Sequence, residues 1–426
     1  MSARTPAQLL EHLFRLTLED INPRSAARES LSEVPPGFER PALIAVGKGA
    51  VAMARGVADA CDISQGIVLC PVAPAGQQQL PRVRYFETDH PVPTARNVEA
   101  SRALRDFAHA LRDSDSCIAA ISGGGSAQIC LPIEPLTLDD IADATNALLR
   151  SGLAIEEINT VRIQLDQLKG GRLADLIAPA RLLTLVIVDV PTGDPAFVSS
   201  GPTILRDTDP ARALELARTA GLGTAAPRVL EALEQGAANP DLPVFARHAP
   251  SEVRVVFDNA LARSAIADHA AAHDLDARVM PDLITGPADE QGRALARAAL
   301  ATTARIDRPT LLIWGGETTV TVPDASIPGG RCQHMALAAA VELEGAAGIT
   351  FAALGTDGVD GTTNACGAIV TGATAAQARS HGYDPATTLH ARRAHELLGT
   401  LDCLVRTGPT GTNVNELYLA LVQPVR

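Results

Sequence analysis

The chain has little lysine, few aromatic residues and no long apolar runs. Only two of its 36 Lys and Arg residues are lysine, and aromatic residues make up 3% of its 426 residues. No apolar run approaches the roughly 20 residues that a bilayer-spanning helix needs. The N-terminal stretch also lacks the hydrophobic region of a secretory signal. We therefore expect a soluble, cytoplasmic protein with no membrane segment.

The chain also has no excess of positive charge and no cysteine or histidine cluster with the spacing of a metal site. The formal net charge is −13, whereas nucleic-acid binding needs clustered positive charge, so no nucleic-acid partner is expected. The seven cysteines are widely spaced and contain no C-x-x-C pair, which predicts buried thiols in a reducing compartment. The ten histidines form no H-E-x-x-H motif.

The two lysines, Lys48 and Lys169, both stand beside glycines. Arginine is abundant in this chain, so a retained lysine indicates a task that a compact ammonium performs and a broad guanidinium does not. Phosphate binding is such a task, because glycine lets the backbone approach the same ligand. The alternative is chance survival of two lysines on the surface.

Short apolar runs alternate with Ala- and Leu-rich helical stretches along the chain. Such continuous runs are typical of strands covered by helices on both faces, and they predict an α/β protein with mostly parallel sheets. The glycine, Asp and Thr clusters follow the runs, at the strand ends where ligands bind in such sheets. The expected strands are 41–46, 116–121, 182–188, 253–257, 310–314, 349–354 and 403–405.

The length and the composition predict two α/β lobes with an active site in the cleft between them. The polar, Pro-containing stretch 235–250 is the expected divide, which gives an N-terminal domain over 1–240 and a C-terminal domain over 250–426. The first 35 residues or so are expected to form an amphipathic helix within the first domain.

The first glycine loop of interest follows the expected strand 116–121. Three glycines between two serines allow positive φ angles and converging amide groups, which is typical of a phosphate cradle at the start of a helix. The loop fits neither the P-loop nor the dinucleotide-binding spacing. The alternative is a tight turn that packs helix on strand. Its residues are Ser122, Gly123, Gly124, Gly125 and Ser126.

Two further groups in the first half could handle phosphate and metal. If their segment is helical, Arg162 and Lys169 lie on one face and suit phosphate oxygens, although an exposed basic face would give the same pattern. Asp189 and Asp194 follow a buried strand. Carboxylates there suit Mg²⁺ or accept a proton from a substrate hydroxyl. Helix capping is the alternative reading of both.

The second half adds polar residues at glycine-rich turns. Arg331 follows two glycines and could grip a carboxylate with two hydrogen bonds. Glu317 also follows two glycines, Asp357 lies in an Asp-Gly-x-Asp-Gly turn, and Asn413 ends a Thr- and Gly-rich loop. The Asp-Gly turn has no Glu at the twelfth position, so an EF-hand is rejected.

These motifs, taken in order, resemble the MOFRL-type (class II) glycerate 2-kinases, also labelled hydroxypyruvate reductases. The resemblance covers nearly the whole chain and implies ATP- and Mg²⁺-dependent phosphorylation of the 2-hydroxyl of D-glycerate. It also implies essential roles for Lys48 and Arg331. The matching segments are 47–48, 90–93, 121–127, 157–162, 169–172, 189–191, 200–203, 315–318, 329–333, 356–361 and 407–414.

From the residues and this resemblance we assign the expected roles. The acceptor is a small hydroxy acid, and a homo-oligomer is left open. Lys48, Asp189 and Arg331 are the catalytic candidates, and Asp189 and Asp194 are the metal ligands. The ATP-binding candidates are Ser122, Gly123, Gly124, Gly125, Ser126, Lys169, Glu317, Asp357 and Asn413.

Several positions depart from the family pattern. Ile163 and Gln164 stand where the family has Lys and His, Asp166 where it has Ser, and His334 where it has an acid. The loss of cationic donors predicts that plain D-glycerate is a poor acceptor, unless these positions lie behind the site and compensate one another. A non-catalytic relative is a second alternative. A hydroxypyruvate reductase is a third, although the chain has no dinucleotide fingerprint.

Overall fold

The computed structural model describes residues 4–190, 192–205, 209–238, 252–321 and 326–424. The chain forms two compact units. One covers Pro23–Val256, and the other combines Met1–Asn22 with Phe257–Arg426. The fold class is α/β, as expected, with a six-stranded sheet and flanking helices in each unit. Of the expected divide at 235–250, residues 235–238 lie at the end of a helix (Pro227–Ala238), and the rest lies outside the described residues.

The sheet of the Pro23–Val256 unit has the strand order β3-β2-β1-β4-β5-β6. The four pairs β1–β2, β1–β4, β2–β3 and β4–β5 are parallel. Every residue of β1 and β4 is buried, which explains their unbroken apolar sequences. The strands are β1 (Ala42–Val46), β2 (Gln65–Cys70), β3 (Val83–Glu87), β4 (Ser116–Ile121), β5 (Arg181–Ile187) and β6 (Glu252–Phe257).

The helices of this unit form two groups. Five of them, α6, α7 and α9 to α11, have a separate apolar core that includes Leu148, Val161 and Val229. The other helices lie beside the first sheet. The bounds are α2 (Pro23–Glu29), α3 (Ala50–Ala60), α4 (Ala95–His109), α5 (Gly125–Gln128), α6 (Leu138–Arg150), α7 (Ile155–Gln164), α8 (Arg172–Ile177), α9 (Pro210–Thr219), α10 (Leu222–Ala225) and α11 (Pro227–Ala238), with 3₁₀ turns η1 (Gly76–Gln78) and η2 (Pro195–Ser200).

The second sheet has the strand order β11-β10-β9-β12-β8-β7. Only β7–β8 is parallel, and the other four pairs are antiparallel. Here the pairing differs from the mostly parallel sheet expected, because a continuous apolar run indicates cover on both faces and does not fix strand direction. The strands are β7 (Asp276–Pro287), β8 (Thr310–Thr319), β9 (Ile349–Gly355), β10 (Gly367–Thr371), β11 (Leu404–Val405) and β12 (Glu416–Val422).

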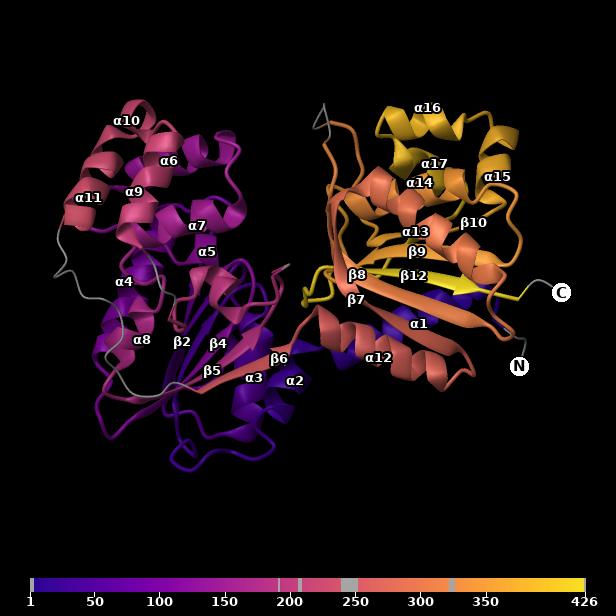
Figure 1. Ribbon diagram of the computed structural model, residues 1–426. Helices are drawn as coiled ribbons and strands as arrows, with labels where there is room; N and C mark the ends of the chain where they lie inside the picture. The colour runs from indigo at the N-terminus through magenta and orange to yellow at the C-terminus, as the bar shows by residue number, and fades with distance from the viewer. Residues whose placement is uncertain (1–3, 191, 206–208, 239–251, 322–325, 425–426) are drawn as a thin grey trace. The chain divides into compact units, whose positions relative to one another are not determined.

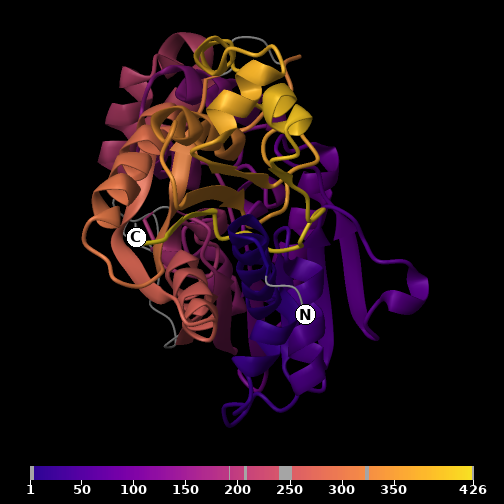
Figure 2. The same cartoon turned by 90° about the vertical axis from the view of Figure 1, so that its right-hand side faces the viewer.

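Helices cover both faces of this second sheet (Figure 1). Figure 1 shows α1 and α12 on one face and α13 and α14 on the other, and Figure 2 shows the indigo α1 beside α12. The helices are α1 (Pro6–Asp20), α12 (Asn259–Ala271), α13 (Ala288–Thr303), α14 (Arg331–Glu342), α15 (Thr374–Ser380), α16 (Pro385–His390) and α17 (Ala394–Thr400).

The N-terminal helix α1 packs with the C-terminal part of the chain. It begins with a capping box, in which the Thr5 side chain and Gln8 bond each other's backbone N–H. Leu10, Leu13 and Phe14 are buried on its apolar stripe. The helix contacts β9, β12 and α12. It therefore belongs to the unit that contains Phe257–Arg426, whereas the expected first domain, 1–240, included it.

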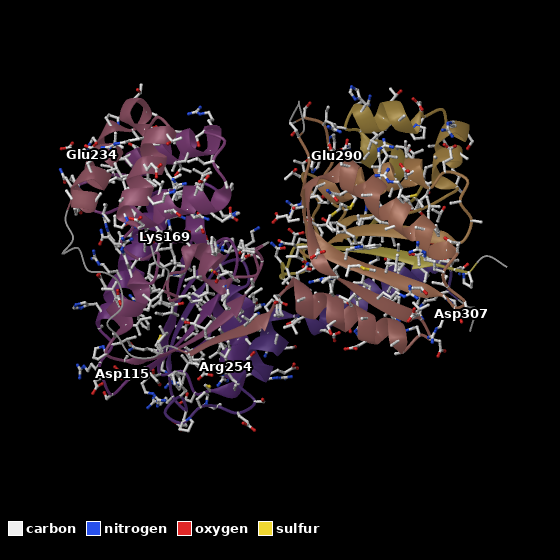
Figure 3. The ribbon with its side chains drawn as sticks, in the orientation of Figure 1. Asp115, Lys169, Glu234, Arg254, Glu290 and Asp307 are labelled. Carbon is white, nitrogen blue, oxygen red and sulfur yellow. The ribbon has the colours of Figure 1, made fainter. Side chains whose placement is uncertain are left out.

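Strand β6 departs from the expected division as well. The sequence places 253–257 at the start of the C-terminal domain, whereas β6 completes the first sheet. Apolar patterning identifies the strand but does not specify its partner. Arg254 of β6, labelled in Figure 3, donates a hydrogen bond of 2.6 Å to the Ser30 carbonyl oxygen within the same unit.

All seven cysteines are free thiols, and six of them are buried, as expected. No helix in the described part of the chain is long and apolar enough to cross a membrane.

Candidate active site

Two glycine loops meet at the carboxyl ends of β1 and β4. The Lys48 N–H donates to the Gly123 carbonyl oxygen at 2.8 Å, and the Gly49 N–H donates to Ser122 Oγ at 2.9 Å. Gly47 has a φ of +119°, and a Cβ atom there would overlap with Ser122. The close approach therefore needs glycine. The two backbones are joined while the Lys48 side chain is exposed.

Asp189 lies against this pair of loops. It follows β5, whose neighbour in the sheet is β4. A Cβ atom at Gly123 would overlap with Asp189 Oδ2, so the missing side chain makes room for the carboxylate. The structure therefore brings together the predicted Asp189 and the predicted loop.

His90 is a neighbour of Lys48 that the sequence assigned to a motif but not to the site. A Cβ atom at Gly124 would lie 3.1 Å from Lys48 Cγ and 3.4 Å from His90 Cδ2. Burial, and then the positive charge of Lys48, lower the pKa of His90. An imidazole that is neutral at pH 7 adds a hydrogen-bonding group beside the ammonium without adding a second charge.

Two serines, Ser199 and Ser200, form hydrogen bonds with the Ser122–Ser126 loop. Ser199 Oγ donates to the Ser122 carbonyl oxygen at 2.6 Å, and Ser126 Oγ lies 2.9 Å from Ser200 Oγ. Both Ser199 and Ser200 have positive φ angles, of 54° and 62°. The loop itself opens only the single-turn helix α5 (Gly125–Gln128), so the expected contribution of a helix dipole is small.

Lys169 is buried, whereas Lys48 is exposed. The Lys169 Nζ lies 3.1 Å from Asp166 Oδ2, and the two side chains are 4% and 5% exposed. Lys169 is labelled in Figure 3. Asp166 also accepts the Leu131 and Leu168 N–H groups. Helix α7 ends at Gln164, so the expected helical face shared by Arg162 and Lys169 is wrong.

The two predicted metal ligands differ in their surroundings. Asp194 caps η2, with Oδ1 accepting the Ala196 N–H at 2.9 Å, which is the capping role that the sequence left open. Among the described residues, no three or more His, Cys, Asp or Glu side chains gather as a metal site. Magnesium in phosphoryl transfer needs only one or two protein carboxylates besides phosphate oxygens, and Asp189 at the loop fits that need.

A second cluster lies in the other unit, around Arg331 at the first turn of α14. Arg331 donates from Nη1 to Glu317 Oε1 at 2.7 Å and from Nε to Glu416 Oε1 at 2.6 Å. Glu416 Oε2 accepts the Tyr418 hydroxyl at 2.8 Å and the Thr318 N–H at 3.3 Å. Glu416 is 2% exposed, and no sequence motif marks it as a site residue.

The charges of this cluster are strongly coupled. Burial raises the pKa of Glu416 to about 7, against the attraction of Arg331. Burial alone would lower the pKa of Arg331, but Glu416 and Glu317 outweigh it and raise that pKa. A guanidinium between two carboxylates stays charged at any working pH.

Asp360 fixes the start of the helix that carries Arg331. Its Oδ1 accepts the Cys332 N–H at 3.1 Å, and its Oδ2 accepts the Gln333 N–H at 2.9 Å. These are two of the N–H groups that a helix start leaves unpaired. Asp360 is the second acid of the Asp-Gly-x-Asp-Gly turn, which explains in physical terms why an acid stands there.

Asp357 and Asn413 lie in two turns that are tied together by Thr356. Thr356 Oγ1 accepts the Val414 N–H at 2.9 Å, and the Thr410 N–H donates to the Asp357 carbonyl oxygen at 3.2 Å. The side chains of Asp357 and Asn413 each accept a backbone N–H two residues ahead. The structure therefore joins these two predicted residues in one loop pair.

Comparison with known proteins adds the family. Residues 9–234 match the domain of unknown function DUF4147, and residues 310–416 match the MOFRL family. The chain is 33% identical over 425 residues to D-glycerate 2-kinase of Thermotoga maritima, covering 97% of this chain and 98% of that one. It is 36% identical over 430 residues to a putative hydroxypyruvate reductase of Agrobacterium vitis, with 97% and 94% covered.

A solved structure agrees with the sequence relatives. The crystal structure of glycerate kinase from Thermotoga maritima superposes with a TM-score of 0.88 at 32% identity, over 98% of this chain and 99% of that one. The matches span the two sets of loops described above. The chain therefore belongs to the MOFRL, or glycerate 2-kinase, family.

Proposed function

We propose that the protein is an ATP-dependent kinase that phosphorylates the 2-hydroxyl of D-glycerate. The observation that carries this proposal is the meeting of Lys48, the Ser122–Ser126 loop and Asp189 at one edge of the first sheet. Phosphoryl transfer requires little besides positioning and neutralisation of charge on the moving group. The names of the two Thermotoga maritima relatives, D-glycerate 2-kinase and glycerate kinase, support the same acceptor.

In this proposal the Pro23–Val256 unit binds the phosphates. The amides of Gly123, Gly124 and Gly125 hold phosphate oxygens, and the exposed ammonium of Lys48 stabilises the charge on the transferring group. Asp189 accepts the proton that leaves the attacking hydroxyl, or holds Mg²⁺. When bound, Mg²⁺ supplies charge neutralisation between the phosphate oxygens.

In the same proposal Arg331 binds the carboxylate of the acceptor. A guanidinium offers five donors, and only Nε and Nη1 donate to protein groups within the described residues. Lys169 receives a structural role, because its ammonium is buried against Asp166. Glu317, Asp357 and Asn413 stay predicted nucleotide contacts.

The positions that depart from the family pattern support D-glycerate over a different acceptor. Ile163 is fully buried, and a Cβ atom at Gly170 would overlap with its side chain. His334 is 2% exposed and lies 2.7 Å from an Arg392 nitrogen. Ile163 and His334 therefore pack inside the protein, which supports mutual compensation behind the site.

A steady-state comparison of acceptors tests the proposal. The protein is supplied with ATP and Mg²⁺ and with D-glycerate, L-glycerate, lactate or tartrate, and ADP release is followed. We expect D-glycerate to give the highest kcat/KM, above about 10⁴ M⁻¹s⁻¹. A higher value for another hydroxy acid would favour the altered acceptor, and no ADP release with any of them would favour a non-catalytic relative.

A further inference from the structure

The Glu416 carboxylate is almost completely buried, and its position is fixed by the sheet and by hydrogen bonds. It is the first residue of β12, paired with Gly316 of β8 on one side and Gly355 of β9 on the other. Each carboxylate oxygen has a fixed partner: Oε1 accepts from Arg331, and Oε2 accepts from Tyr418 and Thr318. A carboxylate that is 2% exposed cannot meet a substrate, so its effect on a ligand has to pass through Arg331.

Arg331 combines restraint on one edge with exposure on the other. Its Nε edge is fixed by Glu416, and its Nη1 by Glu317. Nη2 has no hydrogen-bond partner among the described residues, and the side chain is 36% exposed. An incoming carboxylate can therefore reach the Nη2 edge while Nε remains occupied.

We propose that Glu416 is a positioning residue that orients Arg331 for the carboxylate of the hydroxy acid. This inference rests on the proposed function, in which Arg331 binds that carboxylate. A guanidinium has several rotatable bonds, and fixing one edge beforehand reduces the entropy lost when the substrate binds. Glu416 thereby affects acceptor affinity without contacting the acceptor.

Glu416→Gln separates positioning from simple charge. Glutamine has the same shape as glutamate, but its amide carries an NH₂ group where glutamate has an accepting oxygen. In either orientation of the amide, this NH₂ faces a hydrogen-bond donor of the protein. One orientation opposes it to Arg331 Nε, and the other opposes it to the Thr318 N–H. Removing a negative charge next to Arg331 would by itself strengthen anion binding, whereas disturbed positioning weakens it. The two accounts therefore predict opposite signs.

Calorimetric titration of D-glycerate without ATP gives the test, with steady-state kinetics beside it. Both are run above pH 7, so that the wild-type Glu416 is ionised and the substitution removes a negative charge. We expect Glu416→Gln to raise the Kd and the KM for D-glycerate about tenfold, which is the loss of roughly one hydrogen bond to a charged group. The KM for ATP should change less than twofold. The matched control is Glu344→Gln, which removes a carboxylate paired with Arg379 on the surface of the same unit and should leave all values unchanged.

A double-mutant cycle with Arg331→Ala distinguishes positioning from a general structural effect. If Glu416 acts through Arg331, Glu416→Gln changes the Kd less than twofold once the guanidinium is gone. A tenfold effect that persists there, an unchanged Kd, or tighter binding would each overturn the inference. If the wild type binds D-glycerate but transfers no phosphoryl group, the proposed function fails while the Kd comparison still decides the role of Glu416.

Discussion

Lys48 is the residue to which we assign stabilisation of the charge on the transferring phosphoryl group. The scarcity of lysine and the flanking glycines identified it from the sequence, and its exposed side chain over a fixed backbone agrees with that reading. Lys169 satisfied the same sequence criteria but is buried. The sequence did contain a sign of this difference, because Asp166 precedes it by three residues and provides the pairing carboxylate.

Replacing Lys48 tests whether a point charge is required there. Lys48→Ala should lower kcat about 10²–10³-fold, as expected for loss of one preorganised electrostatic group. Lys48→Arg keeps the charge but spreads it over a planar fork, so we expect at least a tenfold loss there too. Circular dichroism and thermal unfolding should match the wild type. A near-normal rate for Lys48→Arg would contradict the point-charge argument.

The Lys169–Asp166 pair should be structural. Lys169→Met leaves the Asp166 carboxylate buried without its partner, which we expect to reduce the free energy of unfolding by about 3–5 kcal/mol. The double variant Lys169→Met, Asp166→Leu should recover part of this loss. Urea denaturation measures both. A Lys169→Met protein of wild-type stability with a raised KM for ATP would instead restore the predicted nucleotide role.

The buried Glu416 gives a pH dependence with a defined sign. Its pKa of about 7 lies above the ordinary 4.5, so the folded protein holds this proton more tightly than the unfolded chain. The stability from that group is complete below pH 4.5 and is lost as the pH rises through 7. The charged and titratable neighbours are Arg331, Glu317, Asp360 and Tyr418, of which Arg331 stays charged throughout.

Glu416→Gln provides the comparison, because an amide does not titrate. Between pH 4.5 and pH 7.5, the free energy of unfolding of the wild type should fall relative to the variant by on the order of 3 kcal/mol. Urea denaturation at several pH values measures this difference. Parallel pH curves for the two proteins would contradict a raised pKa.

At the scale of elements, sequence periodicity located strands but not their partners. Apolar runs identified β1, β4, β5, β8 and β9, because burial on both faces leaves a clear sequence pattern. The antiparallel pairing of β12 with β8 and β9 depends on packing between distant segments, which no local pattern encodes. Glu416 was missed for the same reason, since a single acid at the start of an apolar strand gives no motif.

The serine turn before the loop tests how local strain supports the site. Ser199 has a positive φ and donates to Ser122, so it has both a backbone cost and a hydrogen bond. Ser199→Ala loses the hydrogen bond but keeps the conformational cost of a positive φ, whereas Ser199→Gly loses the hydrogen bond and also removes that cost. We expect the Gly variant to be more stable than the Ala variant by about 1 kcal/mol. Equal stability, measured by thermal unfolding, would contradict this account of the turn.

At the scale of the whole molecule, the sequence predicted the α/β class and the family resemblance, and both are confirmed. The chain path differs from the simple order of two consecutive domains. Helix α1 joins the C-terminal part because its apolar stripe packs against β9, β12 and α12. Amphipathic spacing shows that a helix has an apolar face, but it does not say which surface that face will cover.

Phosphoryl transfer to the 2-hydroxyl of glycerate can be read from ³¹P NMR of the reaction product. The protein is incubated with ATP, Mg²⁺ and D-glycerate, and the phosphorylated position is read from the phosphorus–proton coupling. We expect 2-phosphoglycerate, formed in equal amount with ADP and absent with Lys48→Ala. Formation of 3-phosphoglycerate, or NADPH-dependent reduction of hydroxypyruvate without any phosphorylated product, would contradict it.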